Sequence, residues 1–218
     1  MSSPTKPNEP WDESTANWYA THYGDWPTTC MPIQAETWRP DEALVDIGCG
    51  TGSSLRHLTA LCPQGRLVGI EPSPAMLAIA QQQTQQLGLG ARIEFYCAAA
   101  EALPLADASM DSVLAFSSFH HWQDAALGLR EVLRVLKPNG RLLLSEEPEI
   151  LRLHGIILES LQQQLQAAGF SPPTQRLLTQ DAAACHLIVA RKPALGVLDK
   201  PQPPGHESAP APHTQEAR

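Results

Sequence analysis

Three glycines alternate with other residues in the segment GCGTG at 48–52, directly after an apolar run at 43–47. Glycine lets a ligand approach the backbone closely, because no Cβ covers the N–H groups. In an open α/β sheet, ligands bind beyond the carboxyl ends of the strands, where the strand order reverses. The spacing therefore predicts a ligand-binding turn. The alternative is a tight turn from strand to helix that binds nothing.

Two acidic residues indicate what kind of ligand the loop takes. Neither phosphate pattern matches, because Ser53 stands where the dinucleotide pattern G-x-G-x-x-G has its third glycine and no Lys-Ser or Lys-Thr follows the loop. Asp46 precedes the loop and would repel a pyrophosphate but attract a cation. Glu71 follows the next apolar run, where it can accept hydrogen bonds from both ribose hydroxyls. A positively charged nucleoside without phosphates fits best, and S-adenosylmethionine is such a molecule.

A second set of reactive side chains lies in the segment SSFHHW at 117–122. Histidine titrates near neutral pH, so His120 or His121 can take a proton from a phenol, an acidic carbon or an amine. We expect the neighbouring Phe119 to wall a pocket. Further along, Glu146 and Glu147 follow another apolar run. They either contact a cationic or hydroxylated substrate or remain solvated ahead of a proline.

Apolar runs alternate with amphipathic segments along the chain, and these must position the reactive residues. The predicted strands are 43–47, 66–70, 92–97, 112–116, 141–145, 174–179 and 184–191. The predicted helices are 14–23, 29–38, 53–61, 74–87, 125–136 and 150–168. Strands that alternate with helices indicate a parallel sheet covered on both faces. The predicted fold is therefore α/β, a doubly wound and mostly parallel seven-stranded sheet.

Composition limits the domain organisation. The chain has 218 residues, of which 43% are hydrophobic and 17% charged, as in a globular protein. Of its 20 prolines, nine lie within 1–10 and 193–218. We therefore expect disordered tails at 1–13 and 193–218, the second rich in proline, around one domain at 14–192 whose first segment could serve as a lid.

Charge and cysteine content exclude several classes of partner. A net charge of −8 argues against nucleic acid. No apolar run approaches the ~20 residues of a membrane span, and the first residues have no apolar run typical of a secretory signal. Five cysteines without a C-x-x-C pair indicate reduced thiols and a cytoplasmic location. The eight histidines show no zinc-binding spacing, so we expect no metal.

Four segments resemble successive motifs of the class I S-adenosylmethionine-dependent methyltransferases, and most closely the small-molecule branch that includes the quinone-biosynthesis C-methyltransferases. They are VDIGCGTG at 45–52, GIEPS at 69–73, EALP at 101–104 and LKPNG at 136–140. The resemblance covers 44–147 and implies the Rossmann-like methyltransferase fold. It also implies methyl transfer from S-adenosylmethionine to a small organic acceptor by in-line displacement.

The resemblance implies roles for particular residues. The loop and Asp46 would hold the methionine part of the cofactor, Glu71 the ribose, and residues on either side the adenine. The implied cofactor-binding residues are Asp46, Gly48, Gly50, Gly52, Glu71, Pro72, Ser73, Met76, Ala99, Ala100, Glu101 and Phe116. In this family one histidine of a pair such as His120 and His121 often anchors the loop, while the other is a candidate catalytic base. N-terminal segments of the family often form a lid, and the alternative here is a surface helix.

The chain departs from the family at 98–100, where three alanines replace Gly-Asp-Ala. The aspartate that accepts from the adenine amino group is thus missing, which would cost ~0.5–1.5 kcal/mol of binding. This departure motivates one alternative, a catalytically inactive S-adenosylmethionine-binding module that acts as a partner or regulatory subunit. A nicotinamide-dependent oxidoreductase is a second alternative, and the glycine spacing opposes it.

Overall fold

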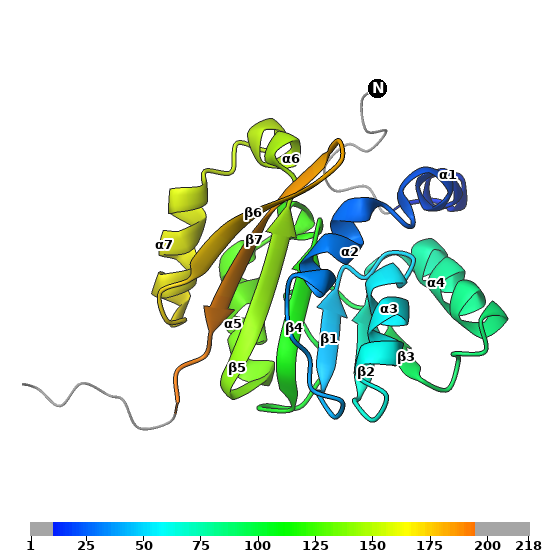
Figure 1. Ribbon diagram of the computed structural model, residues 1–218, viewed down its shortest axis with the longest axis horizontal. Helices are drawn as coiled ribbons and strands as arrows, with labels where there is room; N and C mark the ends of the chain where they lie inside the picture. Colours follow the sequence, from blue (N-terminus) through cyan, green and yellow to red (C-terminus); the bar gives the residue numbers. More distant parts are fainter. Residues whose placement is uncertain (1–10, 195–218) are drawn as a thin grey trace, which may run out of the picture.

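The computed structural model describes residues 11–194, and a seven-stranded sheet forms its centre (Figure 1). The strands are β1 (Leu44–Ile47), β2 (Leu67–Ile70), β3 (Ile93–Tyr96), β4 (Met110–Phe116), β5 (Leu136–Glu146), β6 (Thr174–Gln180) and β7 (Ala183–Arg191). Their order is β3-β2-β1-β4-β5-β7-β6. The first five are parallel, whereas β7 runs antiparallel to both of its neighbours. The predicted α/β sheet is confirmed.

Strand order reverses at β1, which pairs with β2 on one side and with β4 on the other. The carboxyl ends of the five parallel strands meet at one edge of the sheet, which we call the carboxyl edge. It lies at the top of Figure 1. Because the glycine loop follows β1, it lies at the reversal point, where open α/β sheets bind their ligands.

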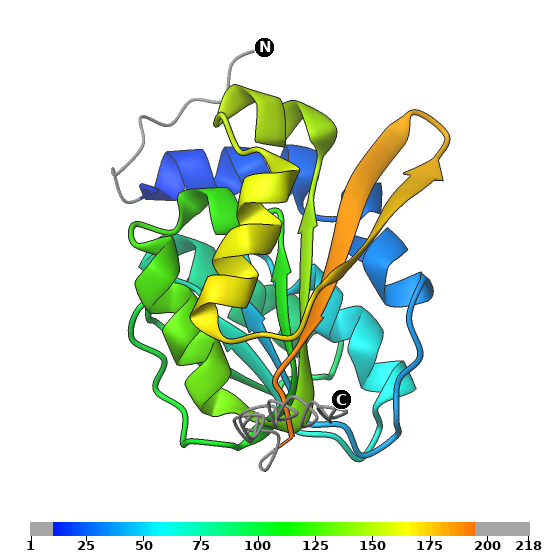
Figure 2. The ribbon, with the colours of Figure 1, turned by 90° about the vertical axis from the view of Figure 1, so that its left-hand side faces the viewer.

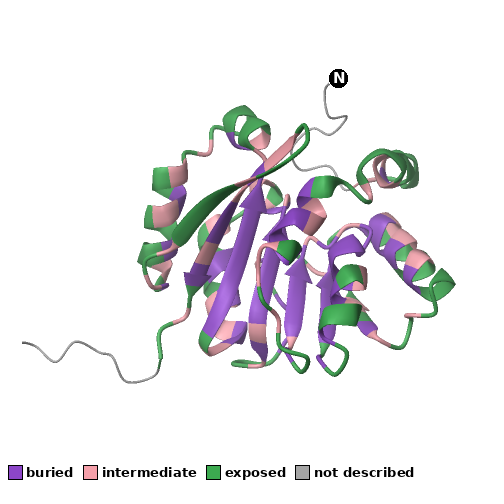
Figure 3. Ribbon diagram, in the orientation of Figure 1, coloured by how far each residue is buried: buried purple, intermediate pink, exposed green. Residues whose placement is uncertain are grey.

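Helices cover both faces of the sheet. They are α1 (Glu13–Tyr23), α2 (Pro27–Gln34), α3 (Ser53–Leu61), α4 (Pro74–Gln86), α5 (Ala125–Val135), α6 (Pro148–Leu153) and α7 (Leu158–Ala168), with a short 3-10 helix η1 (Phe119–His121). Figure 2 shows α5 and α7 on one side of the sheet and α2 and α3 on the other. Each side has its own apolar cluster, and the central strands between them are buried (Figure 3).

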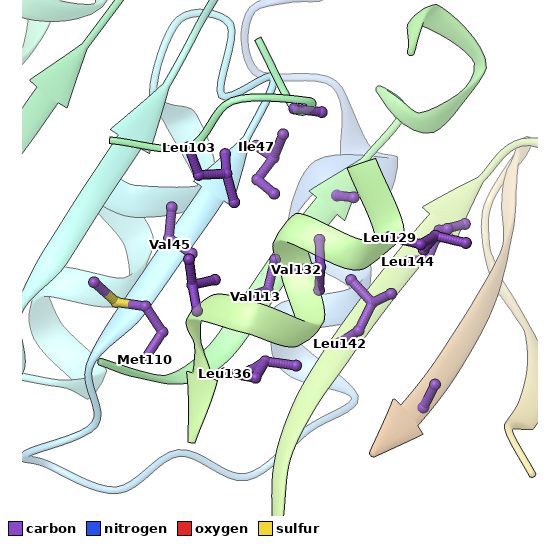
Figure 4. Packing of buried hydrophobic residues seen from close by; sticks show 14 of the residues in the cluster. Val45, Ile47, Leu103, Met110, Val113, Leu129, Val132, Leu136, Leu142 and Leu144 are labelled. Carbon is purple, nitrogen blue, oxygen red and sulfur yellow. The ribbon is translucent and has the colours of Figure 1, made fainter. Parts of the chain in front are cut away.

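The residues of β1 show why these elements form. Val45 and Ile47 point into the cluster under α5, while Leu44 points into the cluster under α3. A parallel strand is buried on both faces, so it reads as a continuous apolar run. On α5, Leu129 and Val132 recur at helical spacing and pack on the same cluster (Figure 4). Asp46 is the single polar residue of β1, and it is buried as well.

The structure corrects several predicted boundaries. The single helix predicted at 150–168 is divided into α6 and α7, because Gly155 takes a left-handed φ of +64° that ends the first helix. The second helix is shorter than predicted, ending before Ala35. β5 begins five residues before the predicted strand and includes the expected turn, in which Asn139 has a φ of +65°.

The first helix begins earlier than predicted. Asp12 caps α1 by accepting a hydrogen bond from the Thr15 N–H at 2.7 Å, so the ordered domain includes residues assigned to the first tail. The remaining tail residues, 1–10 and 195–218, lie outside the described residues. Among residues 11–194, no helix is both long and apolar enough to cross a membrane.

Candidate functional site

All three glycines of the loop have left-handed backbone, with φ of +71° at Gly48, +53° at Gly50 and +75° at Gly52. Gly48 is also required for packing, because a Cβ there would lie 2.5 Å from the Cβ of Ser118. At Gly50, by contrast, a Cβ would meet no atom within 4 Å. The loop therefore leaves open space above Gly50, where a ligand can reach the backbone.

Glu71 lies at the end of β2 and holds this loop. Its carboxylate accepts hydrogen bonds from the Gly50 N–H at 3.1 Å and from the Ser73 N–H at 3.0 Å. Burial raises the pKa of Glu71, and the two backbone donors oppose that shift. A carboxylate has about four lone-pair sites, so two remain for further donors. The carboxylate can thus fix the loop and still accept from a ribose diol.

Asp46 lies under the loop and is only 2% exposed. Its Oδ1 atom is buried without a hydrogen-bond partner. Burial raises the pKa of this carboxyl to about 8, a hydrogen bond with Ser54 lowers it in part, and the charge of Glu71 adds to the increase. A buried acceptor without a partner is costly unless a ligand supplies a donor or a positive charge. Asp46, Glu71 and the open loop together fit a cationic nucleoside.

The residues implied in adenine binding differ in exposure and in the elements that they contact. Pro72 is exposed, and Ser73 caps α4 by accepting from the Met76 N–H at 3.2 Å. Across the loop, Ala99 is exposed, whereas Ala100 is buried in the apolar cluster under α5.

Two further residues of that set have structural contacts. The Glu101 carboxylate accepts from the Asp124 N–H at 3.0 Å, so it holds the start of α5. Phe116 packs in the apolar cluster under α3.

His120 and Glu146 form a buried pair at the carboxyl edge. The Nδ1 atom of His120 lies 2.9 Å from one Glu146 oxygen, and the His120 N–H donates to the other at 3.3 Å. Only 6% of the His120 side chain and 1% of the Glu146 side chain are exposed. The solvated alternative is therefore wrong for Glu146. Because the carboxylate accepts at Nδ1, Nε2 of His120 is left to act as a base.

Two more imidazoles adjoin His120. The ring centroid of His121 lies 4.0 Å from that of His120. The ring centroid of His154, a residue of the linker between α6 and α7, lies 4.6 Å from that of His120. Partial burial and the rings of His120 and His154 lower the pKa of His121 to about 4. Partial burial and the His120 ring lower the pKa of His154, and the charge of Glu146 opposes that shift. Within residues 11–194 no cluster of side chains is arranged to bind a metal.

The N-terminal segment lies beside the carboxyl edge, where Figure 1 shows α1 next to α4. The Thr51 hydroxyl donates to the carbonyl of Gly24 at 2.9 Å, and the Ser53 hydroxyl donates to Asp25 at 2.7 Å. At the beginning of the N-terminal segment, the carbonyl of Trp11 accepts a hydrogen bond from the Ser73 hydroxyl at 3.2 Å. These bonds attach the segment to the loop and to α4, which favours the lid over the surface helix.

Aromatic side chains of this segment pack against one another and against His121. The ring of Trp11 packs edge-on against Tyr19 at 4.6 Å and against His121 at 6.2 Å between centroids. Burial and the charges of Glu147, Glu71 and Glu146 raise the pKa of Tyr19 to about 12. The carboxyl edge is therefore acidic, which suits a sulfonium or an ammonium group.

Sequence reasoning did not find two of these residues, since Trp11 was placed in a tail and His154 within a predicted helix. It did single out Glu146 but did not pair it with a histidine. A signal was present only for Glu146, because an acidic residue directly after a buried parallel strand lies at the ligand-binding edge of the sheet.

Comparison with known proteins identifies what this arrangement is similar to. Residues 45–144 match the family model described as a methyltransferase domain. A ubiquinone/menaquinone biosynthesis C-methyltransferase of Hahella chejuensis is 38% identical over 109 residues, which are 50% of this chain and 44% of that protein. An O-methyltransferase of Aspergillus nomiae is 33% identical over 122 residues, covering 52% of this chain and 54% of that protein. The chain thus spans about half the length of these relatives.

Solved structures extend the similarity of fold over most of the chain. The crystal structure of a putative S-adenosylmethionine-dependent methyltransferase from Methanococcus maripaludis covers 89% of this chain and 99% of that one, with a TM-score of 0.70 and 19% identity. At this identity the match concerns the fold alone. The match covers a larger share of the chain than the family model does.

Proposed function

We propose that this chain is a class I S-adenosylmethionine-dependent methyltransferase and that it transfers a methyl group from that cofactor to a small organic acceptor. One observation carries the proposal: the loop is open above Gly50, between the carboxylates of Asp46 and Glu71. The relatives are named as methyltransferases, so they lend no support to an inactive binding module.

The residues would hold the cofactor in three ways. The open backbone at Gly50 and the carboxylate of Asp46 would border the methionine part, where an ammonium would neutralise the buried acid. Glu71 accepts from the ribose diol, and Met76 borders the adenine. When bound, the cofactor supplies an electrophilic methyl group on a sulfonium, whose carbon–sulfur electron pair stays on sulfur as the new bond forms.

The protein's part in the chemistry is positioning and proton transfer. In-line displacement needs the acceptor atom held against the methyl group and water excluded. The N-terminal segment is attached beside the loop through Thr51, Ser53 and Ser73, where it would limit the access of water. An acceptor that carries a proton on its reacting atom gives it to a base, and we assign that role to Nε2 of His120, which Glu146 orients. His121 is the second candidate.

Calorimetric binding of S-adenosylhomocysteine tests the cofactor site through a matched pair of variants. Gly50→Ala and Gly88→Ala both place a Cβ on left-handed backbone, at φ of +53° and +72°, and neither Cβ meets an atom within 4 Å. Each therefore costs about 1–2 kcal/mol of strain. We expect Gly50→Ala to bind at least tenfold more weakly and Gly88→Ala to bind as the wild type does. Equal affinities would remove the loop from the site.

Transfer of a labelled methyl group from S-adenosylmethionine tests the reaction itself. A panel of hydroquinones, catechols, acidic carbon compounds and amines covers the acceptor classes that a histidine base serves. We expect a labelled product with at least one class. Binding of the cofactor without transfer to any class would favour the inactive module.

A further inference from the structure

A hollow of about 260 Å³ lies at the edge of the sheet where the parallel strands begin, opposite the glycine loop and at the bottom of Figure 1. Its walls come from the linker between α2 and β1, the start of β4, the first residues of β5 and the end of β7. Three of its lining residues are the arginines Arg39, Arg141 and Arg191. We propose that this hollow binds a tetrahedral oxyanion, either inorganic phosphate or the phosphate group of a small monoester. The site needs neither the cofactor nor the methyl acceptor.

The two acidic residues that line the hollow, Glu42 and Asp111, are already neutralised. Glu42 accepts from Nη2 of Arg141 at 3.2 Å and from the backbone N–H of Arg39 at 3.0 Å. Asp111 lies 3.0 Å from Nη2 of Arg39 and accepts from Nζ of Lys137 at 2.8 Å. Opposite charges at this distance largely cancel further away. Neither acid therefore presents a free negative charge that would repel an anion.

The end of β7 carries positive charge that no acid neutralises. Nη1 of Arg191 donates to the carbonyl of Asn139 at 3.2 Å, and Nζ of Lys192 donates to the carbonyls of Leu133 and Leu136 at 2.7 Å each. Neither side chain forms an ion pair within residues 11–194. In a chain of net charge −8, this part of the surface is thus locally positive and attracts an anion.

Hydrogen-bond donors without partners line the hollow on several sides. Arg141 is only 7% exposed, and one of its two Nη1 N–H groups is used, by Glu36 at 2.9 Å. The hydroxyl of Thr37, the carboxamide of Asn139 and Nη1 of Arg39 donate to no other residue in the described part of the chain. Phosphate has oxygens in four tetrahedral directions, so it can accept from more of these donors than a planar carboxylate can.

The buried arginine is held in place, and the hollow is small. Nε of Arg141 donates to the Ser112 hydroxyl at 2.9 Å, and the guanidinium lies 4.7 Å from the centre of the Trp38 ring. A guanidinium that is already fixed loses little entropy when it binds an oxyanion. The volume is below the ~300–1,000 Å³ of sites for drug-sized ligands. We therefore expect the free ion or a monoester with a short carbon chain.

Two exposed arginines give a matched test. Arg191 lines the hollow, whereas Arg130 lies on α5, does not line it and has no ion pair within 11–194 either. Arg191→Gln and Arg130→Gln each remove one positive charge and keep a polar side chain. The probes are sodium phosphate, glycerol phosphate and sodium acetate, each titrated into the 15N-labelled full chain at one ionic strength set with sodium chloride. Binding is read from the backbone amide signals by NMR.

We expect both phosphates to shift the amide signals of Asn139 and Gly140 saturably, with a Kd in the millimolar range, and to leave that of Gly50 at the opposite edge unchanged. Arg191→Gln should weaken this binding at least fivefold, and Arg130→Gln should not. Acetate should bind at least fivefold more weakly than phosphate. Tighter binding of glycerol phosphate would assign the site to a monoester, and tighter binding of inorganic phosphate would assign it to the free ion.

Three results would overturn the inference: shifts that do not saturate, equal weakening by the two glutamine variants, or acetate binding as tight as that of phosphate. The amide signals away from the hollow show in the same spectra that each variant is folded. The experiment uses no adenosyl compound, so its outcome leaves the proposed function to be judged by its own tests.

Discussion

Replacing Asp46 by asparagine should make the protein more stable and a weaker binder of its cofactor. Asp46 is buried, and its Oδ1 atom has no partner. Its pKa is raised from 3.8 to about 8, chiefly by burial. Asparagine has nearly the same shape but carries no charge at any pH. The variant therefore removes the free-energy cost of burying a group that would be ionised in water. It also removes the negative charge that Asp46 would present to a bound ammonium group.

The direction and the size of the change in stability follow from the different pKa values of Asp46 in the folded and unfolded states. Between pH 4 and 8 the unfolded chain ionises Asp46 while the folded protein keeps it protonated, so raising the pH favours unfolding. The stability that Asp46 contributes is thus fully present below pH 4 and lost as the pH rises through 8. With about 1.36 kcal/mol for each tenfold change in proton binding, the loss is at most about 4 kcal/mol at pH 7. An unpaired carboxamide costs about 1–3 kcal/mol, which leaves Asp46→Asn roughly 1–3 kcal/mol more stable.

Urea unfolding at pH 5 and pH 8 measures this effect, with Asp181→Asn as the control. Asp181 is exposed in the turn between β6 and β7 at a φ of +52°, which asparagine tolerates. The advantage of Asp46→Asn over the wild type should grow by about 3–4 kcal/mol between the two pH values, while Asp181→Asn follows the wild type. If Asp46→Asn is less stable at pH 8, or its pH dependence equals that of the wild type, the carboxyl is not held protonated. Unchanged S-adenosylhomocysteine affinity would separate Asp46 from the ligand.

Three further perturbations test other parts of the site. His120→Asn should lower the free energy of unfolding by about 1.5–3 kcal/mol in urea, because Glu146 loses its partner, whereas His121→Asn should not; the reverse order would make His121 the anchor. Glu71→Ala should weaken S-adenosylhomocysteine binding several-fold or more in calorimetry, since it removes the ribose acceptor and frees the Gly50 N–H; unchanged affinity would place the ribose elsewhere. Tyr19→Phe should leave the ultraviolet titration below pH 11 unchanged, because the Tyr19 pKa is about 12; a smaller amplitude would show that Tyr19 is solvated.

The sequence predicts the glycine loop and the strand ends of the site better than it predicts the contacts between side chains there. The glycine loop and Glu71 could be placed because strand–turn–helix spacing is local, and every parallel strand ends at the same edge. The pairing of Glu146 with His120 joins residues 26 apart, and two acids before a proline look the same whether solvated or buried. The division at Gly155 was missed because apolar residues continue on both sides of it at near-helical spacing.

Hydrogen bonds between residues far apart in the sequence were the hardest to predict. Glu101 follows the three alanines at 98–100, and the resemblance implies that it binds the cofactor. In the structure its carboxylate instead accepts from the Asp124 N–H. The lid likewise depends on bonds from Thr51 and Ser53 to residues that a tail-and-helix pattern does not reveal.

The central claim is that the loop binds an adenosyl compound, and a thermal melt of the full chain tests it most directly. S-adenosylmethionine, S-adenosylhomocysteine and NADH are compared in parallel. A ligand at a hundredfold excess over its Kd adds ~2.7 kcal/mol, which raises the Tm of a domain of this size by roughly 5–11 °C. We predict that rise with both adenosyl compounds and none with NADH. No rise with either adenosyl compound, or a rise with NADH alone, would contradict the assignment.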